Sequence, residues 1–123
     1  MNAEIAIKKT VLDYIEGWYE GNTKRMERAL HPELIKRRFV TQDEIWNVSY
    51  KWMIKATREG RGCIADPKTG KKDITILDMN EKIASAKIIS EKYIDYIHLI
   101  KSNDKWKIFN VLWNFAREEN EVE

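Results

Sequence analysis

The sequence predicts an α+β domain in which three N-terminal helices pack on a curved antiparallel sheet. In the first half of the chain, apolar residues recur mostly at helical spacing. After residue 73, four runs of strand-forming residues alternate with short polar turns. A chain of 123 residues is long enough for one domain with its own core, so we assign residues 1–123 to a single domain.

The first two helices are predicted from their end signals. Asn2 is a good N-cap residue, and Gly21 is a C-terminal stop, so the first helix should run to about Glu20. Asn22 or Thr23 then caps a short second helix that ends before Pro32. One face of the first helix should carry the apolar residues Ile7, Val11, Tyr14 and Trp18.

A strand and a third helix should follow. Residues 34–40 are typical of a strand, and Thr41 to Glu44 has the pattern of a capping box. We therefore expect a helix that begins at Thr41 and ends near Gly60. Its buried face would contain Ile45, Val48, Trp52 and Met53. The glycine-containing segment 60–72 is predicted to be a loop.

The second half predicts a four-stranded meander. The strands are expected over residues 74–79, 83–89, 93–101 and 106–115. A two-residue turn at Asn103-Asp104 would pair His98 with Phe109 and Tyr96 with Val111. That aromatic face should meet the helices. The opposite face would carry Asp95, Ile97 and Leu99, and its apolar character predicts a homodimer interface there.

Composition narrows the class of partner and the compartment. The net charge is +2, and the 22 basic and 20 acidic residues are interspersed, which excludes the basic footprint of a nucleic-acid-binding protein. No apolar stretch is long enough for a membrane span, and the basic pair near the N-terminus is not followed by the apolar run of a signal peptide. The lone Cys63 excludes an internal disulfide and fits a reducing compartment, so we expect a cytoplasmic protein.

Two segments resemble a known superfamily. "VLDYIEGWYEGNTKRMERALHPELI", residues 11–35, and "DYIHLIKSNDKWKIFNVLW", residues 95–113, are similar to nuclear-transport-factor-2-like (NTF2-like) domains, which include SnoaL-like cyclases and ketosteroid isomerases. The branch most similar to this chain is labelled putative lumazine-binding. The resemblance implies a cone with a pocket between the helices and the concave side of the sheet, and a dimer through the convex side.

The predicted pocket gathers aromatic and polar side chains. Stacking surfaces, hydrogen-bond donors and one cation are expected to bind a small molecule there. By comparison with the steroid isomerases, Tyr14 corresponds to the tyrosine that polarises the substrate carbonyl, and Tyr96 to the second donor. Arg38 takes the place of their carboxylate base, and a guanidinium cannot remove a proton. The predicted ligand-binding residues are Tyr14, Trp18, Arg38, Tyr96, His98 and Trp113.

Three functions are open on this reading. The first is the binding of a planar or heteroaromatic small molecule. The second is a SnoaL-like or ketosteroid-isomerase-like enzyme (isomerase, dehydratase or cyclase) with His98 as acid–base. The third is a non-catalytic interaction module whose pocket is filled, leaving no cavity above about 300 Å³. No metal site or cofactor is expected, because His31, His98 and Cys63 have no recognisable ligand spacing.

Overall fold

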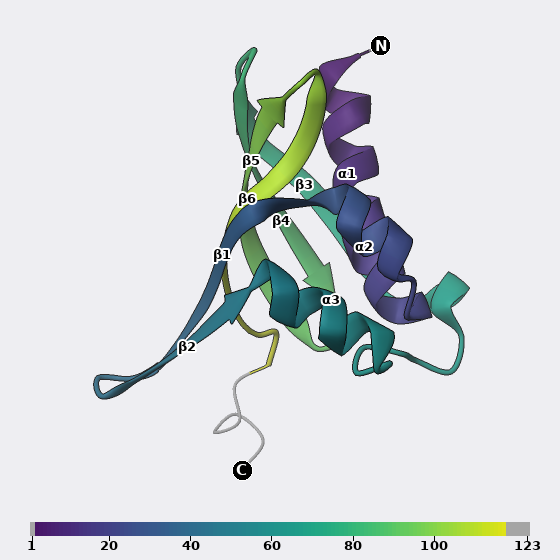
Figure 1. Cartoon of the computed structure of the whole chain (residues 1–123), viewed down its shortest axis with the longest axis vertical. Helices are drawn as coiled ribbons and strands as arrows, with labels where there is room; N and C mark the ends of the chain where they lie inside the picture. Colours follow the sequence, from purple (N-terminus) through teal and green to yellow (C-terminus); the bar gives the residue numbers. More distant parts are fainter. Residues whose placement is uncertain (1, 118–123) are drawn as a thin grey trace.

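A computed structural model describes residues 2–117, and Figure 1 shows the helices on one side of a twisted sheet. The predicted α+β class is confirmed. The helices are α1 (Ala3–Glu20), α2 (Thr23–Ala29) and α3 (Tyr50–Arg58), with a 3₁₀ turn η1 (Pro67–Thr69). The strands are β1 (Leu30–Thr41), β2 (Glu44–Ser49), β3 (Lys72–Met79), β4 (Ile83–Ser90), β5 (Tyr93–Ser102) and β6 (Lys105–Phe115).

The end signals of α1 and α2 are confirmed. The Asn2 side chain accepts a hydrogen bond from the Glu4 backbone N–H at 2.7 Å, which satisfies a donor that the helix itself leaves free. Gly21 ends α1 with φ 68°, in the left-handed region that glycine adopts without strain. Asn22 caps α2 by accepting from the Arg25 N–H at 3.1 Å. α2 ends at Ala29, and Leu30 already belongs to β1.

The predicted start of the third helix is wrong. Thr41 and Glu44 close an antiparallel hairpin between β1 and β2, and α3 begins only after Ser49, whose hydroxyl accepts from the Trp52 N–H at 3.1 Å. The Thr41 hydroxyl does bond a nearby backbone group, the Asp43 N–H, at 3.2 Å. The Thr41 hydroxyl can therefore make the same kind of local hydrogen bond in a turn or at a helix N-terminus. Pairing of residues 44–49 with β1 selects the turn, because tertiary contacts override a local signal.

The six strands form one sheet in the order β2-β1-β6-β5-β4-β3. The predicted meander of β3 to β6 is confirmed, with antiparallel pairs throughout. The expectation of an antiparallel sheet fails at one pair, since β1 runs parallel to β6. β1 therefore lies beside the C-terminal strand, and its inward side chains reach the space beneath the helices.

A β-bulge changes the register of the last hairpin. The predicted two-residue turn is present, with φ 51° at Asn103 and 64° at Asp104, and Ile108 pairs with Leu99. The next pair is His98 with Asn110, so Phe109 is the extra residue of the bulge. From there to the end of β6 every pairing is shifted by one position from the predicted register.

The predicted orientation of β5 is therefore wrong. Asp95, Ile97 and Leu99 are buried beneath the helices, whereas Tyr96 is 47% exposed and His98 is exposed on the convex face. Aliphatic burial explains the choice, because Ile97 and Leu99 are at most 1% exposed and contribute to the core. Asp95 accordingly belongs to the interior and not to an outer interface.

The core lies between α1, α2 and the concave face of the sheet. Its fully buried side chains come from helices and strands alike, and they hold the helical layer over β4, β5 and β6. Within residues 2–117, no helix has the length and apolar character required to cross a membrane. The largest of the core side chains are Ile7, Met26, Leu30, Met53, Ile88, Ile97, Leu99 and Ile108.

Candidate functional site

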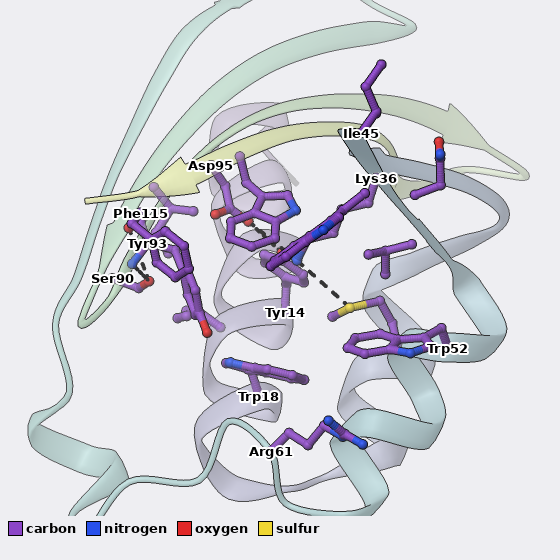
Figure 2. A pocket seen from close by; sticks show the side chains of 17 residues that line it. Tyr14, Trp18, Lys36, Ile45, Trp52, Arg61, Ser90, Tyr93, Asp95 and Phe115 are labelled. Carbon is purple, nitrogen blue, oxygen red and sulfur yellow. Dashed lines mark hydrogen bonds and ion pairs between the residues drawn. The ribbon is translucent and has the colours of Figure 1, made fainter. Parts of the chain in front are cut away.

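A pocket of about 880 Å³ lies between α1, α3 and the concave side of the sheet. This volume lies within the range of small-molecule sites and well above the 300 Å³ limit set for a filled cone. Seven of its 17 lining residues are aromatic (Figure 2). The sheet contributes Trp46, Tyr93, Trp113 and Phe115, and the helices contribute Tyr14, Trp18 and Trp52.

Two tryptophans flank the end of the pocket nearest the 60–63 loop. Figure 2 shows Trp18 on α1 and Trp52 on α3 on opposite walls, with Arg61 below them. The Arg61 guanidinium lies 5.7 Å from the Trp52 ring centroid, within the range of a cation–π contact. Gly62 lies directly against Trp18, since a Cβ at that position would be 2.3 Å from the indole. Any larger residue there would displace the indole.

A polar cluster of three residues occupies the opposite end of the pocket. We call Tyr14, Lys36 and Asp95 the Tyr–Lys–Asp cluster. The Tyr14 hydroxyl donates to Asp95 Oδ2 at 2.5 Å, and Lys36 Nζ donates to the same hydroxyl at 2.5 Å. Lys36 Nζ lies 3.8 Å from Asp95 Oδ2, which is an ion-pair distance but too long for a direct hydrogen bond. Tyr14 therefore bridges the amine and the carboxyl group.

Burial acts on all three ionisable groups of the cluster. It raises the pKa of Asp95 above its ordinary value of 3.8, although the charge of Lys36 and the hydrogen bond from Tyr14 act in the opposite direction. Burial lowers the pKa of Lys36 below 10.5, against the attraction of Asp95. It also raises the pKa of Tyr14, and the Asp95 charge adds to that shift. Burial thus acts against the charged forms of Asp95 and Lys36 and against ionisation of the Tyr14 phenol, and perturbed groups gathered in a pocket are typical of functional sites.

Three of the predicted ligand residues line the pocket. They are Tyr14, Trp18 and Trp113. Among the described residues, the Trp113 indole N–H is the one buried side-chain donor or acceptor without a hydrogen-bond partner. A donor of this kind has a free energy cost of about 1–3 kcal/mol, which an acceptor would remove.

The other three predicted ligand residues lie elsewhere. Arg38 is engaged at the edge of the aromatic wall, 4.6 Å from the Phe115 ring centroid, and its Nε donates to Asn114 at 3.0 Å. Tyr96 and His98 are on the convex face, so their expected place in the cone is wrong. His98 Nδ1 lies 3.5 Å from Asn110 Nδ2, outside the pocket. An acid–base role for His98 within the cone is excluded by this placement.

The predicted ligand-binding residues lack Lys36 and Asp95, and sequence reasoning placed Asp95 on the opposite face of the sheet. The signal was a change of pattern within β6. Lys105 and Lys107 are charged, yet they alternate in the same phase as Val111 and Trp113, which are apolar. A regular strand cannot turn the same phase toward water at one end and toward the core at the other. The change of phase indicates a bulge, and with a bulge Asp95 falls opposite Trp113.

Residues 2–117 contain no group of three or more histidine, cysteine, aspartate or glutamate side chains arranged to hold a metal ion. The pocket combines the phenol, the amine and the carboxyl group of the Tyr–Lys–Asp cluster with aromatic side chains. Such a site can bind a flat organic molecule and form a hydrogen bond to its carbonyl or ring nitrogen.

Comparisons with known proteins agree with this fold. Residues 2–114 match the family model described as "Putative lumazine-binding". No curated protein matches the chain. An NTF2-like protein of unknown function from Methylobacillus flagellatus KT is similar in structure, with TM-score 0.76, 19% identity, and 94% of this chain and 93% of that chain covered. An NTF-2 like protein of unknown function from Silicibacter pomeroyi DSS-3 has TM-score 0.75 and 14% identity, covering 94% and 100%.

Proposed function

Because the chain belongs to the putative lumazine-binding family and has the NTF2-like fold, we propose that its cone binds a planar aromatic or heteroaromatic small molecule. The observation that carries the proposal is an aromatic pocket of about 880 Å³ that ends in a polar cluster. The rings of Trp18 and Trp52 would stack on the ligand. The Tyr–Lys–Asp cluster would bind its polar edge.

Stacking and desolvation supply most of the expected affinity. An aromatic pair contributes about 0.5–1.5 kcal/mol beyond the area that it buries. Lys36 and the indole N–H of Trp113 are donors, so they favour a ligand with carbonyl or ring-nitrogen acceptors. A heteroaromatic ring with exocyclic oxygens meets both requirements.

The test is a titration of the purified protein with lumazine and with 2-naphthol, followed by tryptophan fluorescence, and mass spectrometry of small molecules released from the native protein. We expect saturable quenching, and about tenfold weaker binding in Trp18→Ala, since 1.4 kcal/mol corresponds to a factor of ten. Tyr96→Ala and His98→Ala are matched controls on the opposite face of the sheet and should bind as the wild type does. Quenching that is equally weak in all variants, with no released ligand, would contradict the proposal.

A second candidate function is an enzyme acting on a carbonyl compound in the same pocket. It is supported by the hydrogen bond between Tyr14 and Asp95, whose pKa is raised by burial. A phenol that is hydrogen-bonded to a buried carboxyl group can stabilise a developing oxyanion. This candidate predicts that the protein accelerates exchange of the methyl protons of 2-acetylnaphthalene with D₂O, measured by NMR, and that Tyr14→Phe removes the acceleration.

We also propose a homodimer through the convex face. Exposed apolar side chains lie on neighbouring outward positions there, including Ile35 at 50%, Leu112 at 58% and Tyr96 at 47% exposed. Arg37 and Tyr96 both pair with Leu112, which makes the patch continuous across three strands. Sedimentation at micromolar concentration should give a dimer for the wild type and a monomer for Leu112→Glu. A monomeric wild type would remove this proposal.

The proposed location is the cytoplasm. Cys63 is a free, exposed thiol, and a reducing compartment would keep it in that state. Fractionation of cells that express a tagged full chain would test the location, and recovery outside the cytoplasm would contradict it.

A further inference from the structure

Lys36 is placed unusually for a lysine. Its side chain is only 12% exposed, and it extends from the inward side of β1 into the aromatic pocket. Besides Tyr14 and Asp95, its amine approaches Met53 Sδ at 3.9 Å and lies 5.8 Å from the Trp113 ring centroid. Lysine rarely occupies such a position unless it is paired, because burial of the ammonium form is costly.

The pairing of Lys36 is incomplete. Asp95 is the acidic residue in ion-pair range of Lys36 within the described chain, at 3.8 Å, and its Oδ2 already accepts from Tyr14. The arginines of α2 illustrate full pairing: Arg25 reaches Asp13 at 2.9 Å and Glu16 at 2.6 Å. A structural ion pair would be expected to close to a direct hydrogen bond. The open geometry instead leaves the amine accessible in a cavity.

We propose that Lys36 is a nucleophile that forms an imine with the carbonyl group of an aromatic aldehyde or ketone bound in the pocket. This inference rests on the proposed function, because it requires a planar ligand in the same cavity. An amine in an apolar cavity is activated when its unprotonated form is favoured, and burial lowers the pKa of Lys36 in that direction.

The reaction needs only groups that the site holds. The Lys36 nitrogen adds to the carbonyl carbon, the new C–N bond forms, and the carbonyl electrons move to the oxygen. Both amine protons then leave with that oxygen as water, and a C=N bond remains. Tyr14 lies 2.5 Å from both Lys36 Nζ and Asp95 Oδ2, so it can transfer protons from the nitrogen toward Asp95 and back to the departing oxygen. No oxidant or reductant takes part.

The test is reductive trapping of the full chain with 2-naphthaldehyde and sodium cyanoborohydride at pH 7, where exposed lysines are almost fully protonated. The reductant converts the imine to a stable secondary amine. We expect one naphthylmethyl group per chain, which peptide mapping places on Lys36. Because a lowered pKa increases the unprotonated fraction of an amine, Lys36 should be labelled faster than the exposed lysines.

The variants separate reactivity from folding. Lys36→Met and Lys36→Arg should abolish the rapid phase, with circular dichroism checking that both variants fold. Lys55→Met is the matched control, since that side chain is 70% exposed on the outside of α3, and it should be labelled at Lys36 as fast as the wild type. Tyr14→Phe and Asp95→Asn should slow the trapping of 2-naphthaldehyde, because each removes a group of the proton relay, whereas Lys55→Met should not.

Labelling of Lys36 no faster than of exposed lysines overturns the proposal. Binding of 2-naphthalenemethanol, measured in parallel by fluorescence, identifies what has failed. If that alcohol binds in a Trp18-dependent manner and trapping does not occur, the imine is excluded and the binding function stands. If the alcohol does not bind either, both proposals fail.

Discussion

Asp13 and Asp95 are both 4% exposed, yet their surroundings differ in a way that separates a structural carboxylate from a candidate functional one. Asp13 accepts from Arg25 Nε at 2.9 Å and from Arg28 Nε at 3.0 Å. Asp95 accepts from a neutral phenol at 2.5 Å, and its nearest cation is 3.8 Å away. Burial alone therefore does not determine the direction in which the pKa of an aspartate shifts. In these two residues the direction follows the number of cationic groups that donate directly to the carboxylate.

The two pKa values shift in opposite directions for this reason. Burial by itself would raise the pKa of Asp13, but the hydrogen bonds from Arg28 and Arg25 outweigh it and hold the pKa below 3.8. At Asp95 the burial effect prevails and the pKa is raised. Asp13 lies next to Tyr14 in the sequence, so two adjacent positions of α1 serve the two environments.

The largest expected effect is the loss of the Asp13 network. Asp13→Asn removes the charge from two arginine contacts, and it should lower the free energy of unfolding by about 2 kcal/mol at pH 7, since charged hydrogen bonds each contribute roughly 1.5–3 kcal/mol. Urea denaturation would measure the change. Asp43→Asn, at an exposed turn position, should leave stability unchanged.

The same variant has a defined pH dependence. Because the folded-state pKa of Asp13 is lowered, its stabilisation is present above the ordinary value of 3.8 and is lost as the pH falls through the folded-state pKa. The wild type and Asp13→Asn should therefore become equally stable in acid. A difference that stays constant from pH 7 to pH 3 would show that Asp13 is not held ionised by the arginines.

In the pocket we expect substitution to raise the free energy of unfolding, not to lower it. Replacing the pair with neutral side chains, in the double variant Lys36→Met/Asp95→Asn, should raise the free energy of unfolding by about 1 kcal/mol at pH 7, because a buried pair with poor geometry does not recover its desolvation cost. The amide oxygen can still accept from Tyr14. Chemical denaturation checks the sign, and a loss of stability comparable to that of Asp13→Asn would mean that the cluster is structural.

The gain from the double variant should be greatest near neutral pH. Because the folded-state pKa of Asp95 is raised, the contribution of Asp95 to the free energy of unfolding is favourable below pH 3.8 and is lost as the pH rises through the folded-state pKa. Because the folded-state pKa of Lys36 is lowered, burial of Lys36 reduces the free energy of unfolding by its full amount below that pKa, and this reduction decreases as the pH approaches 10.5. Both penalties act together only between these limits, so a gain confined to the acid or the alkaline end would contradict the assignment.

The smallest effect concerns a partly exposed pair at the edge of the Asp13 network. Lys72 Nζ lies 3.0 Å from Glu16 Oε2, and both side chains are 25% exposed. Lys72→Met should lower stability by about 0.5 kcal/mol, as is usual for ion pairs open to solvent. A double-mutant cycle with Glu16→Gln isolates the coupling, and 0.5 M salt should weaken it. Coupling above that of Asp13 with Arg25 would reverse the expected order of the buried and the partly exposed ion pairs within this network.

Much of the fold could be predicted from local signals. Asn2, Gly21 and Asn22 mark helix ends through contacts within a few residues, and Asn103-Asp104 marks a two-residue turn. The hairpin of β1 and β2 could not be predicted in this way, because Thr41 satisfies a nearby backbone group in either a turn or a helix cap. Its outcome depends on the partner strand.

The candidate site was predicted in part for a related reason. Tyr14, Trp18 and Trp113 were placed in the pocket by periodicity along their own elements. Tyr96 and His98 were misplaced because their orientation depends on pairing with a second strand, and one extra residue, Phe109, reverses it.

By itself, therefore, the sequence determined most of the elements, the ends of α1 and α2 and the aromatic character of the cavity, since these follow from spacing and capping along a continuous stretch of chain. Only the tertiary structure decided which face of β5 points inward and which side chains meet across the pocket. Tyr14, Lys36 and Asp95 are separated by 22 to 81 positions, and their contact depends on the bulge in β6 and on the pairing of β1 with that strand. Burial of Ile97 and Leu99 stabilises that arrangement, and it places Asp95, not His98, inside the cone.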